Sequence, residues 1–183
     1  MEGRAGRRSL FVEKARADLA LLGERGVALG GNAFSSILFL KGEPSDDELA
    51  GKPVLGGPDG VALRAALGAL GYAPEDWCAM LTVDDGGTAL DPCLVREAIC
   101  TLDPGTLVAC DDGAAQALRD AYADELVSLD DFEAAMLAPG KVVRVLGMRV
   151  MALGGFADAL GAPHEMQVMW ARLKQLPPLG EPY

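Results

Sequence analysis

The chain has 183 residues, and half of them are hydrophobic, which is enough for one domain with a buried core. Its formal net charge of −11 disfavours nucleic acid as a partner, because affinity for phosphates comes largely from Lys and Arg. No apolar run approaches the roughly 18 residues of a membrane span, and residues 1–11 lack the apolar stretch of a secretory signal, so we expect a cytoplasmic protein with no membrane partner.

The first half of the chain alternates between helical and strand-like patterns. Apolar residues at helical spacing over residues 8–24 predict a first helix. Residues 36–40 are a short, mostly apolar run, which predicts a strand buried on both faces. After an acidic loop, residues 58–70 predict a helix that begins at a proline and stops at a glycine. Residues 77–83 predict the second strand.

The alternation continues through the middle of the chain. Residues 91–102 predict a helix that begins at an Asp-Pro pair, and residues 106–110 predict the third strand. A polar turn and a helix to residue 122 follow. Residues 128–136 predict a short helix with a serine as its N-cap. Asp131, three residues further on, stands where a capping box has its Glu or Gln.

The last part of the chain completes an α/β pattern. Residues 141–153 split at Gly147 into two alternating halves, which predict an antiparallel pair or a strand with a tight bend. Residues 163–176 predict a closing helix. Strands that alternate with helices predict a single α/β domain, a three-layer α/β/α sandwich with a mainly parallel central sheet. The domain spans residues 1–183, with residues 1–8 and 177–183 as terminal extensions.

Three sequence blocks occur in the order of a known family. The first block begins at residue 37 and consists of the segments ILFL, GEP, GKPVLG and VALRAALGALGY, in that order. They resemble the strand, G-E-x-P-G, G-x-P-F-V-G and helix of the iron–sulfur branch of the uracil-DNA glycosylases. TLVACDDGAAQAL and VMALGGFADALGAPHEMQVMWARLKQL are similar to the later strand and turn and to the closing motif of that family. The resemblance covers residues 35–176 and implies a uracil-DNA glycosylase-like fold, with nucleic acid as a possible partner.

The departures from the family pattern fall at its chemical positions. The aromatic residue that stacks on uracil would fall at Val54, which has no π-face to hold a flipped base. The base-reading asparagine would fall near Leu81 or Thr82. The final His-Pro pair would fall at Gly155 and Phe156, and losing this histidine removes stabilisation of the departing base. The resemblance therefore implies a degenerate active site.

The cysteines do not match the cluster ligands of that branch. No cysteine pair precedes the first predicted strand, so the ligands of an iron–sulfur cluster are missing and we expect no cofactor. A cytosolic protein with no C-x-x-C pair is expected to keep its thiols free. The cysteines are Cys78, Cys93, Cys100 and Cys110.

The candidate site residues come from this resemblance. Glu43 and Asp46 are candidates for a catalytic or water-positioning carboxylate, although a loop residue kept by the scaffold is the preferred explanation for Glu43. His164, the only histidine, is expected at a helix terminus on the surface. No metal ligands are assigned. The residues that would line the ligand pocket are Gly42, Pro44, Val54, Gly56, Leu81, Thr82, Gly155 and Phe156.

Acidic residues follow each of the first three predicted strands, and these strand ends should share one rim of a parallel sheet. Such a rim repels phosphates but could hold a hard cation through oxygen ligands. The simpler alternative is helix capping, as expected for Asp111 or Asp112 and likewise for Asp59 and Asp91. The acidic residues of the rim are Glu43, Asp46, Asp47, Glu48, Asp84, Asp85, Asp111 and Asp112.

Three functions are compatible with these patterns. The first is a degenerate uracil-DNA glycosylase-like protein that acts as a binding or interaction module with an unknown partner. The second is an active but divergent DNA glycosylase that uses Glu43 or Asp46 to orient water. The third is a cation- or small-ligand-binding protein that uses the acidic rim. A basic groove at the strand ends would favour the DNA enzyme, and an acidic mouth would favour the other two.

Overall fold

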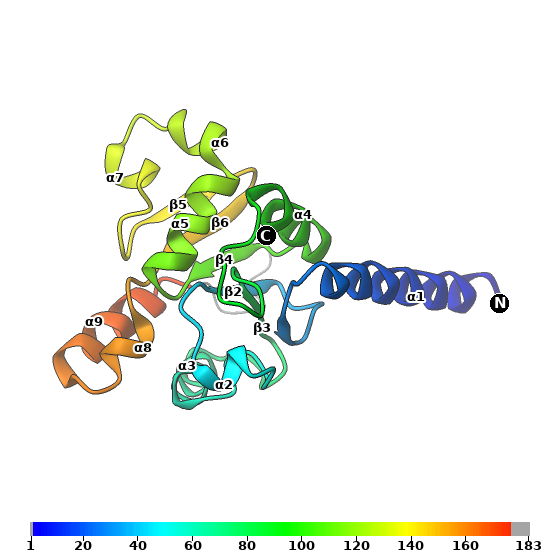
Figure 1. Cartoon of the computed structure of the whole chain (residues 1–183), viewed down its shortest axis with the longest axis horizontal. Coiled ribbons are helices and arrows are strands. Elements are labelled where there is room, and N and C mark those ends of the chain that lie inside the picture. Colours follow the sequence, from blue (N-terminus) through cyan, green and yellow to red (C-terminus); the bar gives the residue numbers. More distant parts are fainter. Residues whose placement is uncertain (1, 177–183) are drawn as a thin grey trace.

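The structure is a computed structural model that describes residues 2–176, with side chains described from Val12 onward. Its centre is a six-stranded mixed sheet of order β1-β3-β2-β4-β6-β5 (Figure 1). The four middle strands are mutually parallel, and each edge strand is antiparallel to its neighbour. The strands are β1 (Leu29–Gly31), β2 (Ile37–Lys41), β3 (Cys78–Leu81), β4 (Thr106–Ala109), β5 (Val142–Val145) and β6 (Met148–Ala152).

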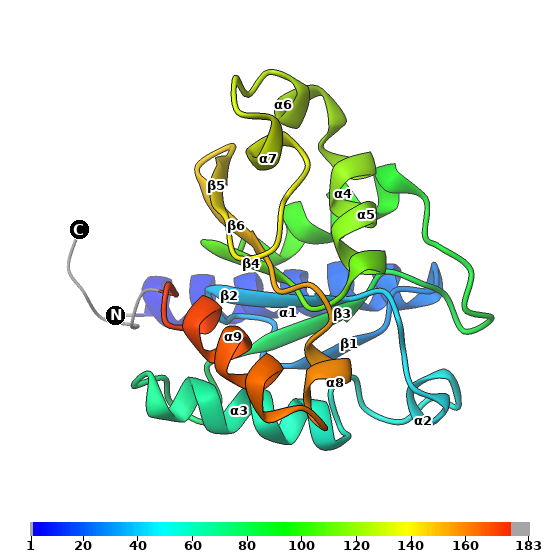
Figure 2. The ribbon, with the colours of Figure 1, turned by 90° about the vertical axis from the view of Figure 1, so that its left-hand side faces the viewer.

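Helices pack on both faces of this sheet (Figure 2). Alternate side chains of a strand point to opposite faces, so Leu38 and Leu40 of β2 join the core on one side and Ile37 and Phe39 join the core on the other. The first core includes α4 and α5, and the second includes α3, α8 and α9. The helices are α1 (Glu2–Glu24), α2 (Asp46–Leu49), α3 (Pro58–Ala69), α4 (Pro92–Leu102), α5 (Asp112–Ala121), α6 (Ala123–Val127), α7 (Phe132–Ala135), α8 (Phe156–Ala159) and α9 (Pro163–Leu173).

The parallel pairing of the first three predicted strands is confirmed. Leu38 lies opposite Cys78 and Leu107, and Leu40 lies opposite Met80 and Ala109. From β2 the chain crosses to β3 on one side and then returns to β4 on the other side. In open α/β sheets this reversal of direction marks the place, at the carboxyl ends of the strands, where ligands bind. The reversal here lies between β2 and β4.

The helix predicted over residues 128–136 is confirmed only over α7, and its predicted start is wrong. Ser128 does not begin a helix but ends α6 as its C-cap. Asp131 is the N-cap of α7, because its carboxylate accepts hydrogen bonds from the amides of Glu133 and Ala134. Because Asp131 rather than Ser128 caps the helix, the segment contains only the four residues of α7.

Several other differences concern short elements. The sequence patterns did not predict β1, α2 or α8, and each has only three or four residues. Residues 2–8, expected as a terminal extension, belong to α1, whereas residues 177–183 lie outside the described residues. Residues 141–153 form the antiparallel pair β5 and β6, with Gly147 in the tight turn at φ 87°. Among the residues that the structure describes, no helix has the length and apolar character needed to span a membrane.

Candidate functional site

The carboxylate of Asp111 occupies the position between β2 and β4 where a ligand would be expected. It is the N-cap of α5 and accepts a hydrogen bond of 2.8 Å from the amide of Ala114. It also accepts hydrogen bonds of 3.0 Å from Gly42 and 3.1 Å from Glu43, whose amides follow β2. Converging backbone amides at a helix N-terminus form an anion-binding concavity. Here the buried side chain of Asp111 occupies this concavity.

The close approach of two glycines makes this arrangement possible. A Cβ atom added to Gly42 would lie 2.4 Å from the amide nitrogen of Ala114 and from the carbonyl carbon of Gly113. Real Cβ atoms do not approach backbone atoms so closely, so only glycine allows the loop after β2 to contact the start of α5. Gly42, one of the predicted pocket residues, therefore has a clear structural role.

Glu43 lies on the exposed side of the same cluster. Partial burial and the nearby charge of Asp111 raise the pKa of its carboxyl group. A backbone hydrogen bond from Gly113 lowers this pKa, but Asp158 and Asp112 raise it further, and the net direction is upward. A carboxyl group with a raised pKa at the end of a parallel strand is the arrangement expected of an acid or base in a functional site.

The repulsion around Glu43 predicts a measurable pKa difference. We expect the pKa of Glu43, followed by NMR titration of its side-chain carbonyl carbon, to lie above its usual value of 4.5. Asp158→Asn should lower this pKa because it removes one of the repelling charges. Asp85→Asn, in the loop after β3, is the matched control and should leave it unchanged. A pKa at or below the usual value would show that these carboxylates do not act on Glu43.

The sign of this shift also predicts a dependence on pH. Since the folded-state pKa of Glu43 is raised, its ionised form disfavours folding, and this unfavourable effect grows as the pH rises through that pKa. Glu43→Gln should therefore stabilise the protein slightly at neutral pH and have no such effect below the usual pKa. Urea denaturation at the two pH values measures the difference. A loss of stability at neutral pH would contradict this expectation.

A cavity of about 230 Å³ lies beside this cluster, between the ends of β2 and β3 and the helix α5. Two of the predicted pocket residues, Gly42 and Thr82, both line it. Val83 and other apolar groups form much of the wall, and Gln116 and Asp120 reach it from α5. The cavity is therefore small and mostly apolar, with a carboxylate at its edge, and it suits a neutral or cationic group better than an anion.

The other predicted pocket residues do not line this cavity. Val54, Leu81 and Phe156 are buried in the core on the opposite face of the sheet. Gly155 is the N-cap of α8 at φ 90°, and its amide bonds to the carbonyl oxygen of Cys110 at 3.1 Å. The remaining two, Pro44 and Gly56, belong to the loops around α2. The structure thus brings together two of the eight predicted positions at one cavity and places three in the core.

A buried ion cluster at the end of β2 was not predicted from the sequence. The ammonium group of Lys41 lies 2.6 Å from the carboxylates of both Glu48 and Asp59, and all three side chains are buried. Glu48 also accepts hydrogen bonds from the amides of Ser45 and Leu55. The cluster joins the strand to α2, to the loop after it and to α3. The only local signal is a lysine at the end of an otherwise apolar strand.

The cluster changes the pKa values of its members. Burial lowers the pKa of Lys41, but the hydrogen bonds to Asp59 and Glu48 outweigh this effect and raise it. Burial raises the pKa of Glu48, and the hydrogen bonds from Lys41, Ser45 and Leu55 outweigh that effect and lower it. Both charged forms are therefore favoured by folding, and the cluster stabilises the fold at neutral pH.

Several acidic residues at the strand ends have structural partners. Asp84 accepts hydrogen bonds from the amides of Gly86 and Thr88 and shapes the loop after β3. Asp91 and Asp111 are N-caps, as the capping alternative predicted. Asp59 instead lies in the first turn of α3 and pairs with Lys41. Within residues 2–176, no three His, Cys, Asp or Glu side chains form a group that could hold a metal ion.

Two further candidates lie outside this cluster. Asp46 is exposed in the first turn of α2, a helix of four residues. His164 is exposed in the first turn of α9, with its Nδ1 atom 3.7 Å from Glu165, which agrees with the surface position expected for it. Neither residue lines the cavity beside Glu43.

Comparison with known proteins adds no family to this description. No protein-family model matches the chain, and a search of curated proteins found no match.

Proposed function

We propose that this protein is a uracil-DNA glycosylase-like domain without efficient glycosylase activity, which acts as a binding or interaction module. The observation that carries the proposal is the position of Val54. This residue stands where the related enzymes have the aromatic residue that stacks on uracil, and it is 3% exposed and packed in the core. A side chain that is both aliphatic and buried offers no stacking surface to a flipped base.

The charge at the mouth supports the same proposal. The residues that follow the four parallel strands include Glu43 and Asp84 in loops, Asp112 at the start of α5 and Asp158 in α8. The basic residue at these strand ends is Lys41, the last residue of β2. Lys41 is buried and already neutralised by two carboxylates. A DNA enzyme needs Lys and Arg to neutralise phosphates around its site, and an acidic mouth repels them.

The position of Gly155 is a further argument against efficient catalysis. In the resemblance it stands where the enzymes have the histidine that stabilises the departing base. Here it adopts φ 90°, a backbone conformation that residues with a side chain rarely adopt. The loop is thus built for glycine, and Gly155→His would introduce backbone strain as well as an imidazole.

One observation favours an active but divergent glycosylase as the second candidate. Glu43 directly follows Gly42, which lines the cavity, although Glu43 itself is not part of the lining; its pKa is raised, and its position matches the glutamate of the family motif. Such a carboxylate could orient a water molecule for attack on a base that enters the cavity. Asp46 is less suitable because it lies in α2, away from the lining of this cavity.

Single-turnover cleavage of uracil-containing DNA distinguishes the two candidates. We expect excision from single- and double-stranded DNA to be absent or very slow, since losing one preorganised electrostatic contact costs about 10²–10³ in rate and losing the stacking wall adds to this. DNA binding should also be weak at physiological salt. Robust excision that Glu43→Ala abolishes would overturn the proposal and establish the active enzyme. Glu75→Ala, an exposed glutamate in the segment between α3 and β3, is the matched control.

A further inference from the structure

The hairpin of β5 and β6 carries two arginines directly opposite each other. Arg144 of β5 is paired with Arg149 of β6. The strands are joined by Leu146 and Gly147, and the pair of residues next to a two-residue turn is hydrogen-bonded. Arg144 and Arg149 form the following pair, in which the backbones exchange no hydrogen bonds and the Cα atoms are only about 4.5 Å apart. The two arginine side chains therefore leave the same face of the hairpin side by side.

The hydrogen bonds of these arginines go to backbone carbonyl groups. Arg144 donates to Gly147 at 3.4 Å, which is a weak contact, and Arg149 donates to Gln175 at 2.8 Å. None of the ion pairs among the described residues involves either arginine. A guanidinium group has five N–H groups, so each arginine keeps most of its donors for another acceptor.

The stretch of chain around the pair supplies no opposite charge. Residues 134–157 contain three basic residues and no acidic residue, in a chain whose net charge is −11. The third basic residue, Lys141, pairs with Asp131 and Glu133. Like charges directly opposite each other in a hairpin are destabilising. Two adjacent guanidinium groups without a carboxylate partner are typical of a site that takes its negative charge from a ligand.

The turn between the two arginines holds an apolar residue in a strained conformation. Leu146 has φ 49° and Gly147 has φ 87°, the positive values that a type I′ turn requires. Asn, Asp and Gly are favoured at the first of these positions, whereas leucine is not. The side chain of Leu146 is also 64% exposed, so it gains little from burial. Neither the turn nor the core needs this leucine, and its side chain is available for an apolar contact beside the arginines.

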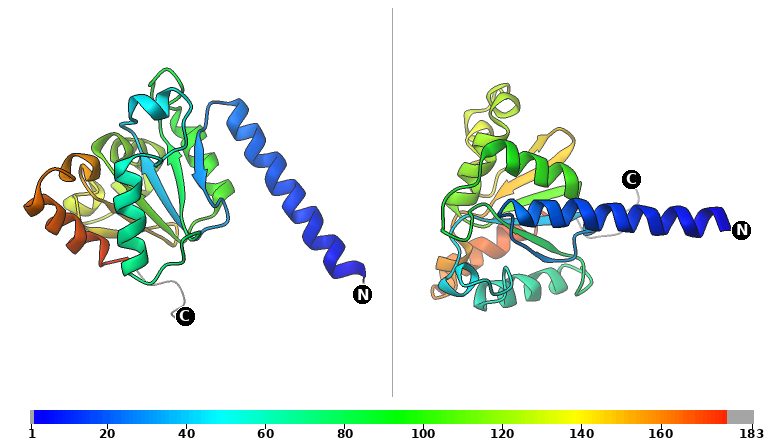
Figure 3. Two further views of the ribbon diagram at one scale, coloured as in Figure 1. Left: turned by 90° about the horizontal axis from the view of Figure 1, so that it is seen from below. Right: turned by 45° about the vertical axis from the view of Figure 1, so that its right-hand side comes forward.

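The hairpin turn lies far from the acidic rim. Since β6 runs parallel to β4, its first residue, Met148, stands at the amino ends of the parallel strands. The helices α2 and α8 follow the carboxyl ends. Figure 3 shows the turn of the hairpin and α2 at opposite ends of the sheet. The repulsion of phosphates at the rim is therefore screened by salt before it reaches the arginine pair.

We propose that Arg144 and Arg149 bind the phosphate group of a small organic phosphate, and that Leu146 contacts the organic part of this ligand. A phosphate monoester has three free oxygen atoms and a charge near −2, so it can accept hydrogen bonds from both guanidinium groups and neutralise both. A carboxylate has two oxygen atoms and a single charge. This site is independent of the cavity at the strand ends and of any glycosylase chemistry there.

Titration of the full chain with phenyl phosphate, inorganic phosphate and acetate tests the proposal. The NMR signals of the arginine Nε–H groups report which arginines bind. We expect saturable shifts at Arg144 and Arg149, with a Kd of about 1 mM or lower for phenyl phosphate, a higher value for inorganic phosphate and the highest for acetate. Salt at about 0.5 M should weaken binding because it screens exposed charges. The absence of a saturable shift up to about 20 mM phenyl phosphate would overturn the proposal.

Arg144→Glu distinguishes a binding role from a structural one. The new carboxylate would lie opposite Arg149 and compete with the ligand, so binding of phenyl phosphate should weaken by about tenfold or more. The melting temperature should rise, because opposite charges replace like charges across the hairpin. Phosphate binding that survives Arg144→Glu would overturn the proposal.

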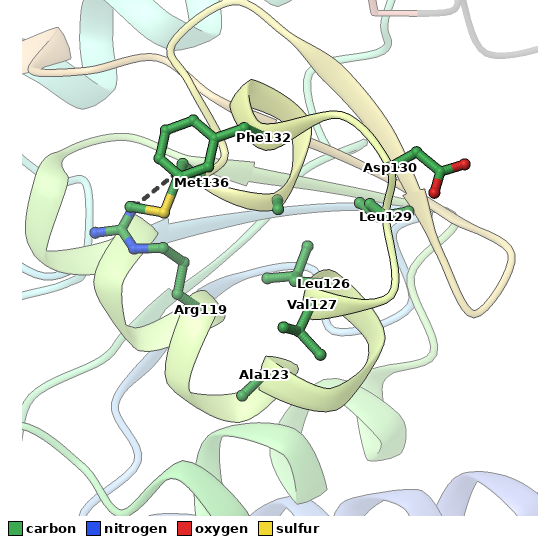
Figure 4. A pocket seen from close by; sticks show the side chains of 9 residues that line it. Arg119, Ala123, Leu126, Val127, Leu129, Asp130, Phe132 and Met136 are labelled. Carbon is green, nitrogen blue, oxygen red and sulfur yellow. Dashed lines mark hydrogen bonds between the residues drawn. The ribbon is translucent and has the colours of Figure 1, made fainter.

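Arg119→Glu is the matched control, since it changes the net charge by the same amount at an arginine that stands alone. Arg119 lines a groove of about 470 Å³ between α5, α6 and α7 and donates a hydrogen bond of 3.1 Å to the carbonyl oxygen of Met136 (Figure 4). This variant should bind phenyl phosphate as the unmodified protein does. An equal loss of binding in both variants would show that only the overall charge matters and would overturn the proposal.

Leu146→Asn tests the contact with the organic part. Asparagine is favoured at this position of the turn, so the variant should fold, which circular dichroism verifies. Its affinity for phenyl phosphate should fall by about threefold, whereas its affinity for inorganic phosphate should not change. If phenyl phosphate binds no more tightly than inorganic phosphate, or if Leu146→Asn has no effect, the site does not recognise an organic phosphate and the proposal is wrong.

Discussion

Lys41→Met is expected to lower the free energy of unfolding by about 3–5 kcal/mol, as for the removal of one partner from a buried ion pair. The substitution leaves the carboxylates of Glu48 and Asp59 buried beside each other without the ammonium group that lies 2.6 Å from both. Urea denaturation followed by circular dichroism measures the change. The matched control is Lys52→Met. Lys52 also lies 2.7 Å from an aspartate, but its side chain is 63% exposed, so the loss should be below about 1 kcal/mol.

The pH dependence of the same variant provides a second test. In the unmodified protein the lowered pKa of Glu48 contributes stability above its usual value of 4.5, and this contribution is lost as the pH falls through the folded-state pKa. The raised pKa of Lys41 contributes stability below its usual value of 10.5, and this contribution is lost as the pH rises through the folded-state pKa. The cluster is therefore most stabilising between these two values.

In the Lys41→Met variant, the effect of the cluster on stability at acid pH should be the opposite of that in the unmodified protein. Without the lysine, burial is no longer outweighed and raises the pKa of Glu48, so acidification from neutral pH should restore part of the lost stability. The unmodified protein should not gain stability from the cluster over the same range. An equal response of both proteins to acidification would show that these carboxylates are not buried as the structure places them.

Gly42→Ala is expected to destabilise the protein by about 3 kcal/mol, at the upper end of the range for overpacking. The new methyl group would meet backbone atoms of Gly113 and Ala114 at 2.4 Å, and backbone cannot move aside as a flexible side chain can. The loop after β2 must shift, and the hydrogen bonds from Gly42 and Glu43 to Asp111 should lengthen. The amide protons of residues 42 and 43 should exchange faster with solvent as a result.

Gly68→Ala is the control for this substitution. Gly68 lies within α3, and an added Cβ would meet nothing within 4 Å. Alanine is favoured over glycine in a helix, so this variant should be as stable as the unmodified protein or more stable by up to about 1 kcal/mol. If Gly42→Ala proved equally harmless, the contact between the loop after β2 and the start of α5 would not be as close as described.

The alternation of strands and helices could be predicted from the sequence because it depends on local patterns. The runs that became β2, β3 and β4 are apolar at nearly every position, since a strand covered on both faces buries every side chain. The caps Asp91 and Asp111 were recognisable because the amides that they bind lie two and three residues further along the chain. Elements of three or four residues, such as β1 and α8, are too short for a periodic pattern.

The candidate site could be predicted only in part. The carboxyl ends of β2 and β3 were expected to meet, and Gly42 and Thr82 do line one cavity. Val54 was also assigned to the pocket, but it packs against Gly30 of β1, a strand that had not been predicted. A position matched by order along the chain does not show which face of the sheet it will occupy, and this depends on how the loops fold over the sheet.

The α/β class, the order of the longer strands and helices, and the acidic character of the chain follow from the sequence alone. The three-dimensional structure was needed to show that Lys41 pairs with carboxylates 7 and 18 residues away, and that Asp111 binds amides 68 and 69 residues before it. The groove beside α7 likewise depends on how α5, α6 and α7 fold against one another. Local patterns report which residues each element buries. Contacts between distant residues depend on the path of the whole chain, and the ion cluster, the filled anion concavity and the groove are all contacts of that kind.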